Sequence, residues 1–282
     1  MKRELVALER AYNVFKTSMA ITPEPAKFAP LLFAGDWERG LETAAELGYD
    51  AVEVSLRDPQ TEAVKKLGKA VRSSGLTVSA IATGQSYYND GLSPTSPDPS
   101  IQARLLDRMK GHVDFAALWG ALVIIGGVRG TFEGEPETHA AQRQRAVDAI
   151  RGYAEYARSQ GVSLAIEPIN RYETNFVNTV EEALGFIEEV GARNLVVLTD
   201  TFHMNIQEVS IARSFERAGE KLGYVHFADS NRQAAGQGHI DFHELASVLR
   251  KSGYDGYICA EILPLPDSRT AAKLAIDYFR SL

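Results

Sequence analysis

The segment Leu164-Ala-Ile-Glu-Pro-Ile-Asn-Arg-Tyr-Glu173 carries the pattern on which the fold prediction depends. Its first three residues are apolar and strand-like, Glu167 follows directly, and Pro168 then opens a polar turn. Three later segments share this design and end in an acid or an imidazole: Leu195–Asp200, Leu222–His226 and Tyr257–Glu261. Ionisable side chains at the C-terminal ends of four successive apolar strands predict one shared site.

Strand-like and helical patterns alternate along the rest of the chain. The expected strands are Phe15–Thr22, Tyr49–Leu56, Leu76–Ala82, Ala121–Ile125, Val162–Ile166, Leu195–Leu198, Leu222–Phe227 and Tyr257–Ala260. Between them we expect helices that begin near Asp36, Gln60, Ser100, Glu137, Thr179, Ser210, Asp241 and Ser268. Apolar strands that alternate with helices imply a parallel sheet covered by helices. Eight such units predict an α/β protein with a closed (β/α)8 TIM barrel, and a doubly wound open sheet is the alternative.

The chain shows one candidate boundary, close to its N-terminus. Residues 1–13 place Leu5, Leu8 and Tyr12 at helical spacing, which predicts a short amphipathic extension. No later stretch is rich enough in Pro, Gly or Ser to divide the chain, so residues 14–282 are expected to form a single barrel domain.

Composition restricts the class of partner. The 282 residues carry a formal net charge of −7, which argues against nucleic acid or an anionic membrane surface as the main partner. The single cysteine, Cys259, lies in an apolar run and is expected to be a buried residue. The chain start has no signal-peptide core, and no run approaches a membrane span. These features predict a cytoplasmic protein that acts on a small molecule.

The residues at the four strand ends form a candidate metal site. Three converging carboxylates would repel one another, so their convergence requires a cation. Glu167, Asp200, His226 and Glu261 would supply three oxygen donors and one nitrogen donor. An oxygen-rich set suits Mn²⁺, our first choice, or Mg²⁺ or Co²⁺ better than a structural zinc ion.

Two of these ligands also suggest a reaction. Glu167 and Glu261, on opposite sides of a metal-held ketose, could remove a proton from one face of the carbon beside the ketone and return it on the other face. The metal would hold the carbonyl and the adjacent hydroxyl and stabilise the enediolate. The expected outcome is epimerisation at that carbon. His203 either contacts the substrate or packs, and we favour substrate contact.

The order of these residues resembles the ketose 3-epimerases, such as D-tagatose and D-psicose 3-epimerases, within the xylose isomerase-like barrels. The series is Glu167, Asp200, His203, His226, Arg232 and Glu261, with Asn170-Arg171-Tyr172-Glu173 after the first acid. The stretches Thr83-Gly-Gln, Ala228-Asp-Ser-Asn-Arg and Leu263-Pro-Leu-Pro look most like the 5-keto-L-gluconate epimerase branch, which forms D-tagaturonate.

The resemblance implies roles for particular residues. Glu167 and Glu261 would be the acid/base pair and also metal ligands, with Asp200 and His226 completing the coordination. Glu173, His203 and Arg232 would hold the terminal oxygens of the substrate, and the protein would be a homodimer or homotetramer.

The sequence also departs from that branch. Gln233-Ala-Ala-Gly-Gln-Gly238 stands where an aromatic residue is expected, so the substrate preference could differ. A keto-uronate would need a cation for its carboxylate, and Arg57 and Arg129 are candidates by position. Gln85, in the polar loop after the third expected strand, is a further expected substrate contact.

Other functions use the same barrel. An aldose–ketose isomerase of the hydroxypyruvate isomerase type and a keto-inositol dehydratase would also pass through an enediolate or enolate. A DNA repair enzyme of the endonuclease IV type would need several zinc ions, more histidines and a basic face, which conflicts with the negative charge. A non-catalytic sugar-binding protein would not need paired carboxylates on a metal.

Overall fold

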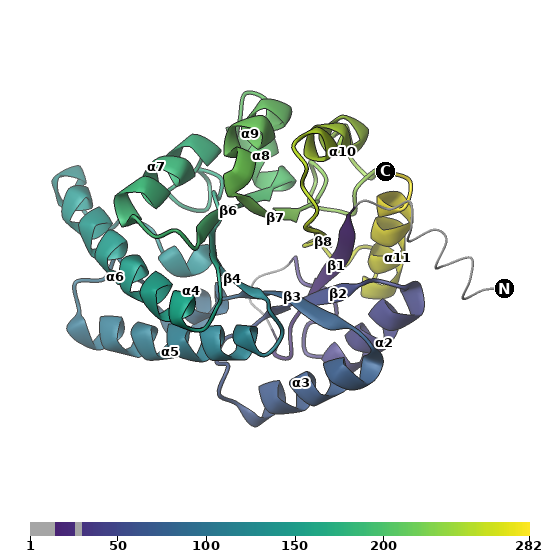
Figure 1. Cartoon of the computed structure of the whole chain (residues 1–282), viewed down its shortest axis with the longest axis horizontal. Coiled ribbons are helices and arrows are strands. Elements are labelled where there is room, and N and C mark those ends of the chain that lie inside the picture. Colours follow the sequence, from purple (N-terminus) through teal and green to yellow (C-terminus); the bar gives the residue numbers. More distant parts are fainter. Residues whose placement is uncertain (1–14, 26–29) are drawn as a thin grey trace.

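Eight parallel strands close into a barrel in their order along the chain, with β1 hydrogen-bonded to both β2 and β8 (Figure 1). The computed structural model describes residues 15–25 and 30–282. The strands are β1 (Lys16–Ile21), β2 (Ala51–Ser55), β3 (Thr77–Ala82), β4 (Leu122–Ile125), β5 (Leu164–Ile166), β6 (Leu195–Asp200), β7 (Leu222–His226) and β8 (Tyr257–Ala260). The predicted (β/α)8 barrel is confirmed. The expected extension over residues 1–13 lies outside the described residues.

Helices surround the barrel and connect its strands (Figure 1). They are α2 (Trp37–Leu47), α3 (Glu62–Ser74), α4 (Gln85–Asp90), α5 (Pro99–Ala117), α6 (His139–Ser159), α7 (Val180–Val190), α8 (Thr201–Gln207), α9 (Ile211–Ala218), α10 (Phe242–Lys251) and α11 (Ser268–Phe279). Local chemistry sets their ends. The Thr179 side chain accepts a hydrogen bond from the Glu182 amide at 3.1 Å and so caps α7. Gly48 ends α2 with a φ of 78°, a conformation that favours glycine.

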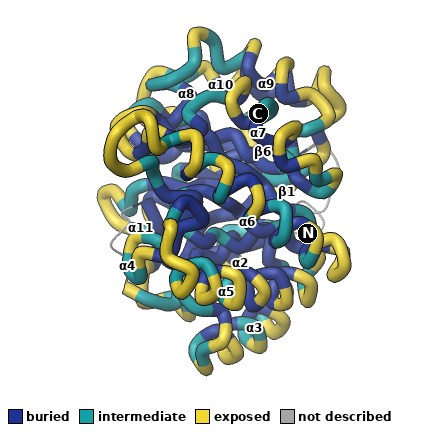
Figure 2. The backbone as a smooth tube through the Cα atoms, turned by 90° about the vertical axis from the view of Figure 1, so that its left-hand side faces the viewer, coloured by how far each residue is buried: buried dark blue, intermediate teal, exposed yellow. Residues whose placement is uncertain are grey.

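Burial increases from the helix surfaces toward the barrel. In Figure 2 the backbone of the strands is buried, whereas the exposed residues lie on the outer turns of the helices and on the connecting loops. The amphipathic helices therefore turn their apolar sides toward the sheet and their charged sides toward water.

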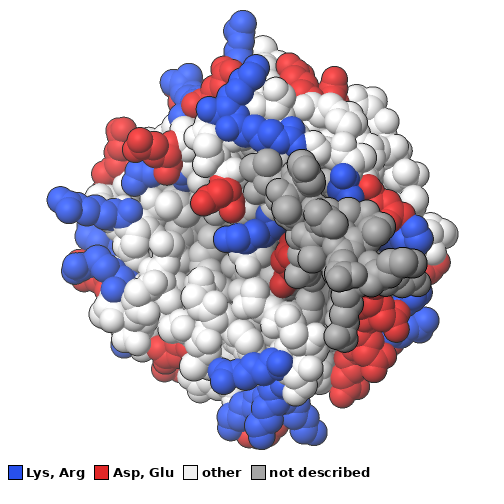
Figure 3. Space-filling model, turned by 45° about the vertical axis from the view of Figure 1, so that its right-hand side comes forward, with Lys and Arg blue, Asp and Glu red and all other residues white. Residues whose placement is uncertain are grey.

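Charged side chains of both signs cover the exterior. On the face drawn in Figure 3, Lys and Arg lie in separate groups with Asp and Glu beside them. Nucleic-acid binding requires a clustered basic surface, and the described part of this face has none. Among the residues that the structure describes, no helix combines the length and apolar character needed to cross a bilayer.

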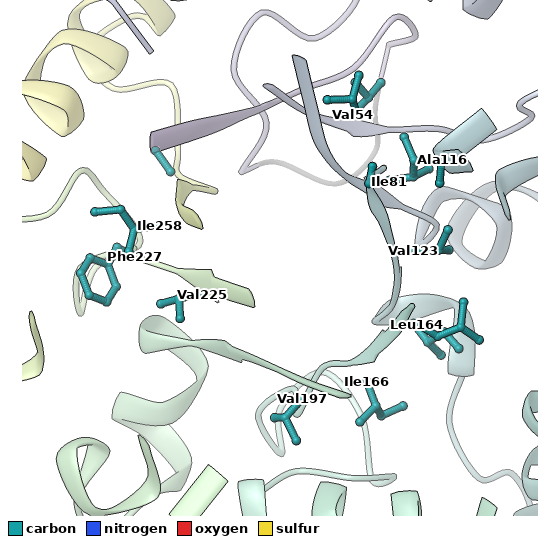
Figure 4. Close-up of a cluster of buried hydrophobic side chains, with 14 of the residues drawn as sticks. Val54, Ile81, Ala116, Val123, Leu164, Ile166, Val197, Val225, Phe227 and Ile258 are labelled. Atoms are coloured by element: carbon teal, nitrogen blue, oxygen red, sulfur yellow. The ribbon is translucent and has the colours of Figure 1, made fainter. Parts of the chain in front are cut away.

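Each strand directs alternate side chains to the two sides of the barrel wall. Figure 4 shows Leu164 and Ile166 of β5 and Ile258 of β8 on the side of the wall that the helices cover. Ala165 and Cys259, the residues between or beside them, instead belong to a smaller buried cluster with Leu198 and Tyr224. This second cluster fills the barrel interior and forms the floor beneath the strand ends.

The same alternation places the candidate ligands. The side chain two positions after an interior residue also faces inward, and here it lies at the C-terminal mouth of the barrel. Ala165 is followed in this way by Glu167, Leu198 by Asp200, Tyr224 by His226 and Cys259 by Glu261. Strand register aligns the ends, because Asp200 pairs with His226 and His226 with Cys259.

Candidate active site

Four buried ionisable groups meet at the mouth of the barrel. Glu167 follows β5, Asp200 ends β6, His226 ends β7 and Glu261 follows β8. One ligand atom from each residue lies within 4.8 Å of those of the other three. All four side chains are buried. The four residues proposed from the sequence as metal ligands are thus brought together in one cluster.

Two atoms in this cluster have no hydrogen-bond partner among the described residues. They are Oδ2 of Asp200 and Nδ1 of His226, both fully shielded from solvent. His226 Nδ1 lies 3.6 Å from Asp200 Oδ2, 3.6 Å from Glu261 Oε2 and 3.8 Å from Glu167 Oε1. Buried polar atoms normally have partners. These two unsatisfied atoms, in a cluster of ligand atoms from four residues, fit a divalent cation.

The hydrogen bonds of Asp200 leave one oxygen for the site. Its Oδ1 accepts from the Phe202 amide at 2.8 Å and thereby caps α8, while Oδ2 faces the cluster. Asp200 therefore ends β6, caps α8 through Oδ1 and presents Oδ2 to the cluster.

Burial perturbs the carboxyl groups in different directions. It raises the pKa of Glu167 to about 8, with the Glu261 charge adding to the effect, and it raises the pKa of Glu261 to about 7. Burial also opposes ionisation of Asp200, but His203, His226 and Arg232 outweigh it and hold the pKa of Asp200 below its usual value. A bound cation would lower both raised values.

Asn170, in the short loop after β5, positions the predicted substrate contacts Glu173, in the same loop, and His203, in α8. The Asn170 side-chain amide donates to Glu173 Oε1 at 2.8 Å and to His203 Nδ1 at 2.7 Å. His203 Nε2 then faces the cluster, 4.0 Å from Glu167 Oε1 and 3.9 Å from Asp200 Oδ2. Burial lowers the pKa of His203 to about 3, so the ring is neutral at pH 7.

Arg232 reaches the cluster from the loop after β7. Its Nη2 donates to Glu261 Oε2 at 2.7 Å, and its guanidinium lies over the Phe202 ring at 4.6 Å. Its φ of 59° is in the left-handed region, a conformation that non-glycine residues adopt mostly where the surroundings impose it. Asp229 stabilises this loop by accepting hydrogen bonds from the Gly236 and Ile240 amides.

A pocket opens beside the cluster. It is lined by Ser55, Ala82, Thr83, Gly84, Gln85, Tyr88, Ile124, Gly126, Gly127, Glu167, Ile169, Glu173, His203, His226 and Glu261. Gly126 is needed for its shape, because a Cβ at this position would lie 2.2 Å from Glu167 Oε2. The pocket thus contacts both candidate acid/base residues.

Two predicted substrate contacts have other partners. Gln85 lines the pocket, but its Nε2 donates to Thr22 Oγ1 at 2.9 Å and to Ser55 Oγ at 3.2 Å. Arg129 is fully buried outside the pocket lining, and its guanidinium donates to the backbone carbonyls of Gly126, Glu167, Phe176 and Val177. These contacts assign Arg129 to bracing the loops. Arg57, the other candidate for a substrate carboxylate, forms an ion pair with Asp90.

Two further residues of this region had no role in the sequence interpretation. Asn170 was noted only as part of a polar turn, although it orients both Glu173 and His203. Glu53, in the middle of β2, contacts His226 Nε2 at 2.8 Å. An acid between two valines in a strand is the sequence feature by which Glu53 could have been found.

Comparison with known proteins gives the same class. Residues 41–282 match the family described as the xylose isomerase-like TIM barrel, and the chain belongs to that family. The L-ribulose 3-epimerase of Methylomonas sp. (strain DH-1) is 33% identical over 237 residues, which cover 82% of each chain. The D-psicose 3-epimerase of Agrobacterium fabrum (strain C58) is 30% identical over 261 residues, which cover 89% of this chain and 83% of the relative.

A solved structure supports the same relationship. The D-allulose 3-epimerase from Methylomonas sp., in complex with D-allulose, is 26% identical and superimposes with a TM-score of 0.75. The match covers 95% of this chain and 98% of that chain. These relatives are named as sugar 3-epimerases, and the chain is accordingly a sugar epimerase.

Proposed function

We propose that this protein is a metal-dependent epimerase that inverts the carbon adjacent to the ketone of a neutral ketose. The observation that carries the proposal is the convergence of Glu167, Asp200, His226 and Glu261 beside a pocket, with two buried ligand atoms that lack partners in the described structure. A divalent cation held there would neutralise the carboxylates and polarise the substrate carbonyl. We expect Mn²⁺, with Mg²⁺ or Co²⁺ as alternatives.

The acid/base work falls to Glu167 and Glu261. They follow β5 and β8, which are separated by two strands, so they reach the cluster from different parts of the barrel mouth. One carboxylate removes the proton from the carbon beside the carbonyl, and the other carboxyl group returns a proton to the opposite face. The carbon is inverted, and the two residues exchange roles in the reverse direction.

Substrate orientation falls to the rim of the pocket. Glu173 and His203 line the pocket and are held in place by Asn170. Arg232 reaches Glu261 from the facing loop. Glu173 and His203 therefore offer hydrogen-bonding groups to the hydroxyls of a sugar in the pocket.

The charge of the pocket supports a neutral ketose over a keto-uronate. Within the part of the chain that the structure describes, none of the pocket-lining residues is Lys or Arg. Arg232 lies outside that lining and already contacts Glu261, with Glu173 3.6 Å from its Nη1. Arg129 and Arg57 are engaged elsewhere. A substrate carboxylate would therefore lie near Glu167, Glu173 and Glu261, with no lysine or arginine among the described lining residues to offset them.

Isotope incorporation tests this proposal. The protein, loaded with Mn²⁺, is incubated in D₂O with neutral ketoses such as D-psicose and L-ribulose and with the keto-uronate D-tagaturonate. The metal is then removed with a chelator and the products are identified by NMR. We expect deuterium only at the carbon beside the ketone, together with a new diastereomer of a neutral ketose. An aldose would show an isomerase, a lost hydroxyl would show a dehydratase, and turnover of the uronate alone would contradict the neutral substrate.

A further inference from the structure

Glu53 is a fully buried acid that the proposed reaction does not use. It lies in the middle of β2, and its neighbours Val52 and Val54 pack in the core between the barrel and the helices. By strand alternation Glu53 therefore points into the barrel. There it meets His226, which comes from β7 on the other side of the barrel.

The contact with Glu53 gives the two nitrogens of the His226 ring different surroundings. Nε2 lies 2.8 Å from Glu53 Oε2, whereas Nδ1 lies on the side of Asp200, Glu261 and Glu167, at 3.6, 3.6 and 3.8 Å. A carboxylate accepts hydrogen bonds, so the proton between the two side chains belongs to Nε2. In the neutral ring, the lone pair of Nδ1 is then directed at the oxygen atoms of Asp200, Glu261 and Glu167.

Packing holds the ring in this orientation. Tyr224 stands edge-on to His226, with ring centroids 5.6 Å apart and an interplanar angle of 81°. The Tyr224 hydroxyl contacts Ser79 Oγ at 2.6 Å, and Ser79 Oγ contacts Ser18 Oγ at 2.7 Å. The ring is thus supported from below by Tyr224 and hydrogen-bonded from β2 by Glu53.

We propose that Glu53 is a positioning residue that fixes the His226 tautomer and so presents Nδ1 to the cation. Carboxylates that hold the distal nitrogen of a metal-binding histidine orient the ring and strengthen the ligand. The inference rests on the proposed metal site and extends it to a residue on the far side of the barrel.

A different use of Glu53 is also chemically conceivable. Donor atoms of Glu53, His226 and Cys259 lie within 4.8 Å of one another. A second cation there would take the Nε2 atom of His226, which the hydrogen bond to Glu53 occupies in this structure. The two arrangements differ in metal stoichiometry, which the experiment measures.

The first experiment compares Mn²⁺ binding by calorimetry to the metal-free wild type and to three variants. Glu53→Leu removes the acceptor at similar size, and we expect it to weaken Mn²⁺ binding by about 10- to 100-fold. Glu53→Gln keeps a side-chain oxygen that can accept from Nε2, so its affinity should lie nearer to that of wild type. Asn194→Ala is the control, because it removes a side-chain amide that donates to the carbonyls of Ala154 and Val162, away from His226 and the residues that support it. It should bind Mn²⁺ as wild type does.

The outcomes separate the two proposals. Wild-type protein that binds no Mn²⁺ overturns the metal site and, with it, this inference. Wild type that binds one Mn²⁺ while folded Glu53→Leu binds it equally well overturns the role of Glu53 alone. Equal weakening in Glu53→Leu and Glu53→Gln would indicate that the charge of Glu53, and not its hydrogen bond to Nε2, supports metal binding. That result also contradicts the positioning role, as does binding of two ions per chain.

A second measurement needs no variant to fold. Wild-type protein with ¹⁵N-labelled histidine is loaded with Zn²⁺ as a diamagnetic probe, and long-range ¹H–¹⁵N spectra report the state of each ring nitrogen. For His226 we expect the proton on Nε2 and the metal on Nδ1. Metal on Nε2, or a proton on Nδ1 in the loaded protein, would overturn the proposal.

Discussion

Asn170 has no proposed part in proton transfer or metal binding, yet it orients two residues of the site. Its amide group joins Glu173 to His203, which come from different elements and line the pocket. Because both residues are proposed to hold the sugar, their orientation controls the position of the reacting carbon. The resemblance to the ketose 3-epimerases implied Glu173 and His203 as substrate contacts, but the side chain that connects them is apparent only in three dimensions.

Replacing Asn170 with Ala should reduce kcat/KM by about 10- to 100-fold, mainly through KM, because the substrate would be less well oriented. Steady-state kinetics on the ketose that the isotope experiment identifies as substrate measures this change. Asn194→Ala is the matched control, since Asn194 Nδ2 donates to the carbonyls of Ala154 and Val162, residues away from the pocket. It should lower stability and leave KM unchanged, and an unaltered KM in Asn170→Ala would contradict the role of Asn170.

His112 predicts a pH dependence of stability that is independent of the site. Burial lowers its pKa to about 3, and Ser86 Oγ lies 3.4 Å from its Nε2. In the unfolded chain its pKa is about 6.5. As pH falls below about 6.5, His112 becomes protonated in the unfolded state but stays neutral in the native state. His112 therefore lowers the free energy of unfolding by about 1.4 kcal/mol for each pH unit between about pH 6.5 and about pH 3.

Removing that group should flatten the acid limb of the stability curve. Urea unfolding between pH 7 and pH 4 should show a smaller loss of unfolding free energy in His112→Asn than in wild type, measured relative to each protein at pH 7. His243→Asn, at an exposed position of α10, should retain the wild-type slope. Identical slopes in His112→Asn and wild type would contradict the expectation.

At the scale of elements, the strands were predictable because their apolar runs are continuous and end in polar residues. Two helices were missed, α4 (Gln85–Asp90) and α8 (Thr201–Gln207), because six or seven residues are too few to establish a helical period. Tertiary contacts define them instead. Asp200 begins α8 as its cap, and Gln85 anchors α4 to Thr22 and Ser55.

Arg129 links the loops after β4 and β5. Its guanidinium donates to four backbone carbonyls, two of which belong to Phe176 and Val177. The position of Arg129 after the fourth strand suggested substrate contact, but the sequence could not reveal that its guanidinium would donate to four buried backbone carbonyls. Burial lowers its pKa to about 10, so it stays charged at neutral pH.

Arg129→Lys should therefore act on stability. A lysine cannot satisfy the same set of carbonyls, and the unfolding free energy should fall by about 2–4 kcal/mol, with a Tm lower by several degrees. Thermal and urea unfolding of the metal-free protein measure this. Arg158→Lys, at an exposed position of α6, is the control. A Tm equal to that of wild type in Arg129→Lys would contradict the bracing role.

At the scale of the molecule, four consecutive strands contribute one proposed ligand each, so a bound cation would connect β5, β6, β7 and β8. A ligand that binds only the native state stabilises it by about 2.7 kcal/mol at 100 times its Kd. Mn²⁺ should raise the Tm of metal-free protein by several degrees, and EDTA should reverse the shift. Asp200→Asn should show a much smaller shift, and an equal Tm in Mn²⁺ and EDTA for wild type would exclude a tight site.

The sequence could predict the barrel, the order of its strands and the convergence of Glu167, Asp200, His226 and Glu261, because the period of two in a strand and the position of strand ends are local properties. It could not predict the contact between Glu53 and His226, which joins residues 173 positions apart across the barrel. Nor could it decide the substrate class, which depends on which arginines the fold occupies with other partners.

The central claim is that Glu167 and Glu261 act on opposite faces of one carbon, and proton exchange in single variants tests it most directly. Glu167→Gln and Glu261→Gln, each at saturating Mn²⁺, are incubated in D₂O with either epimer of the substrate pair, and exchange is followed by NMR. We predict that neither variant interconverts the epimers, that each exchanges the proton of one epimer only, and that the two variants act on different epimers. Epimerisation at the wild-type rate by either variant, or exchange of the same epimer by both, would contradict the two-carboxylate mechanism.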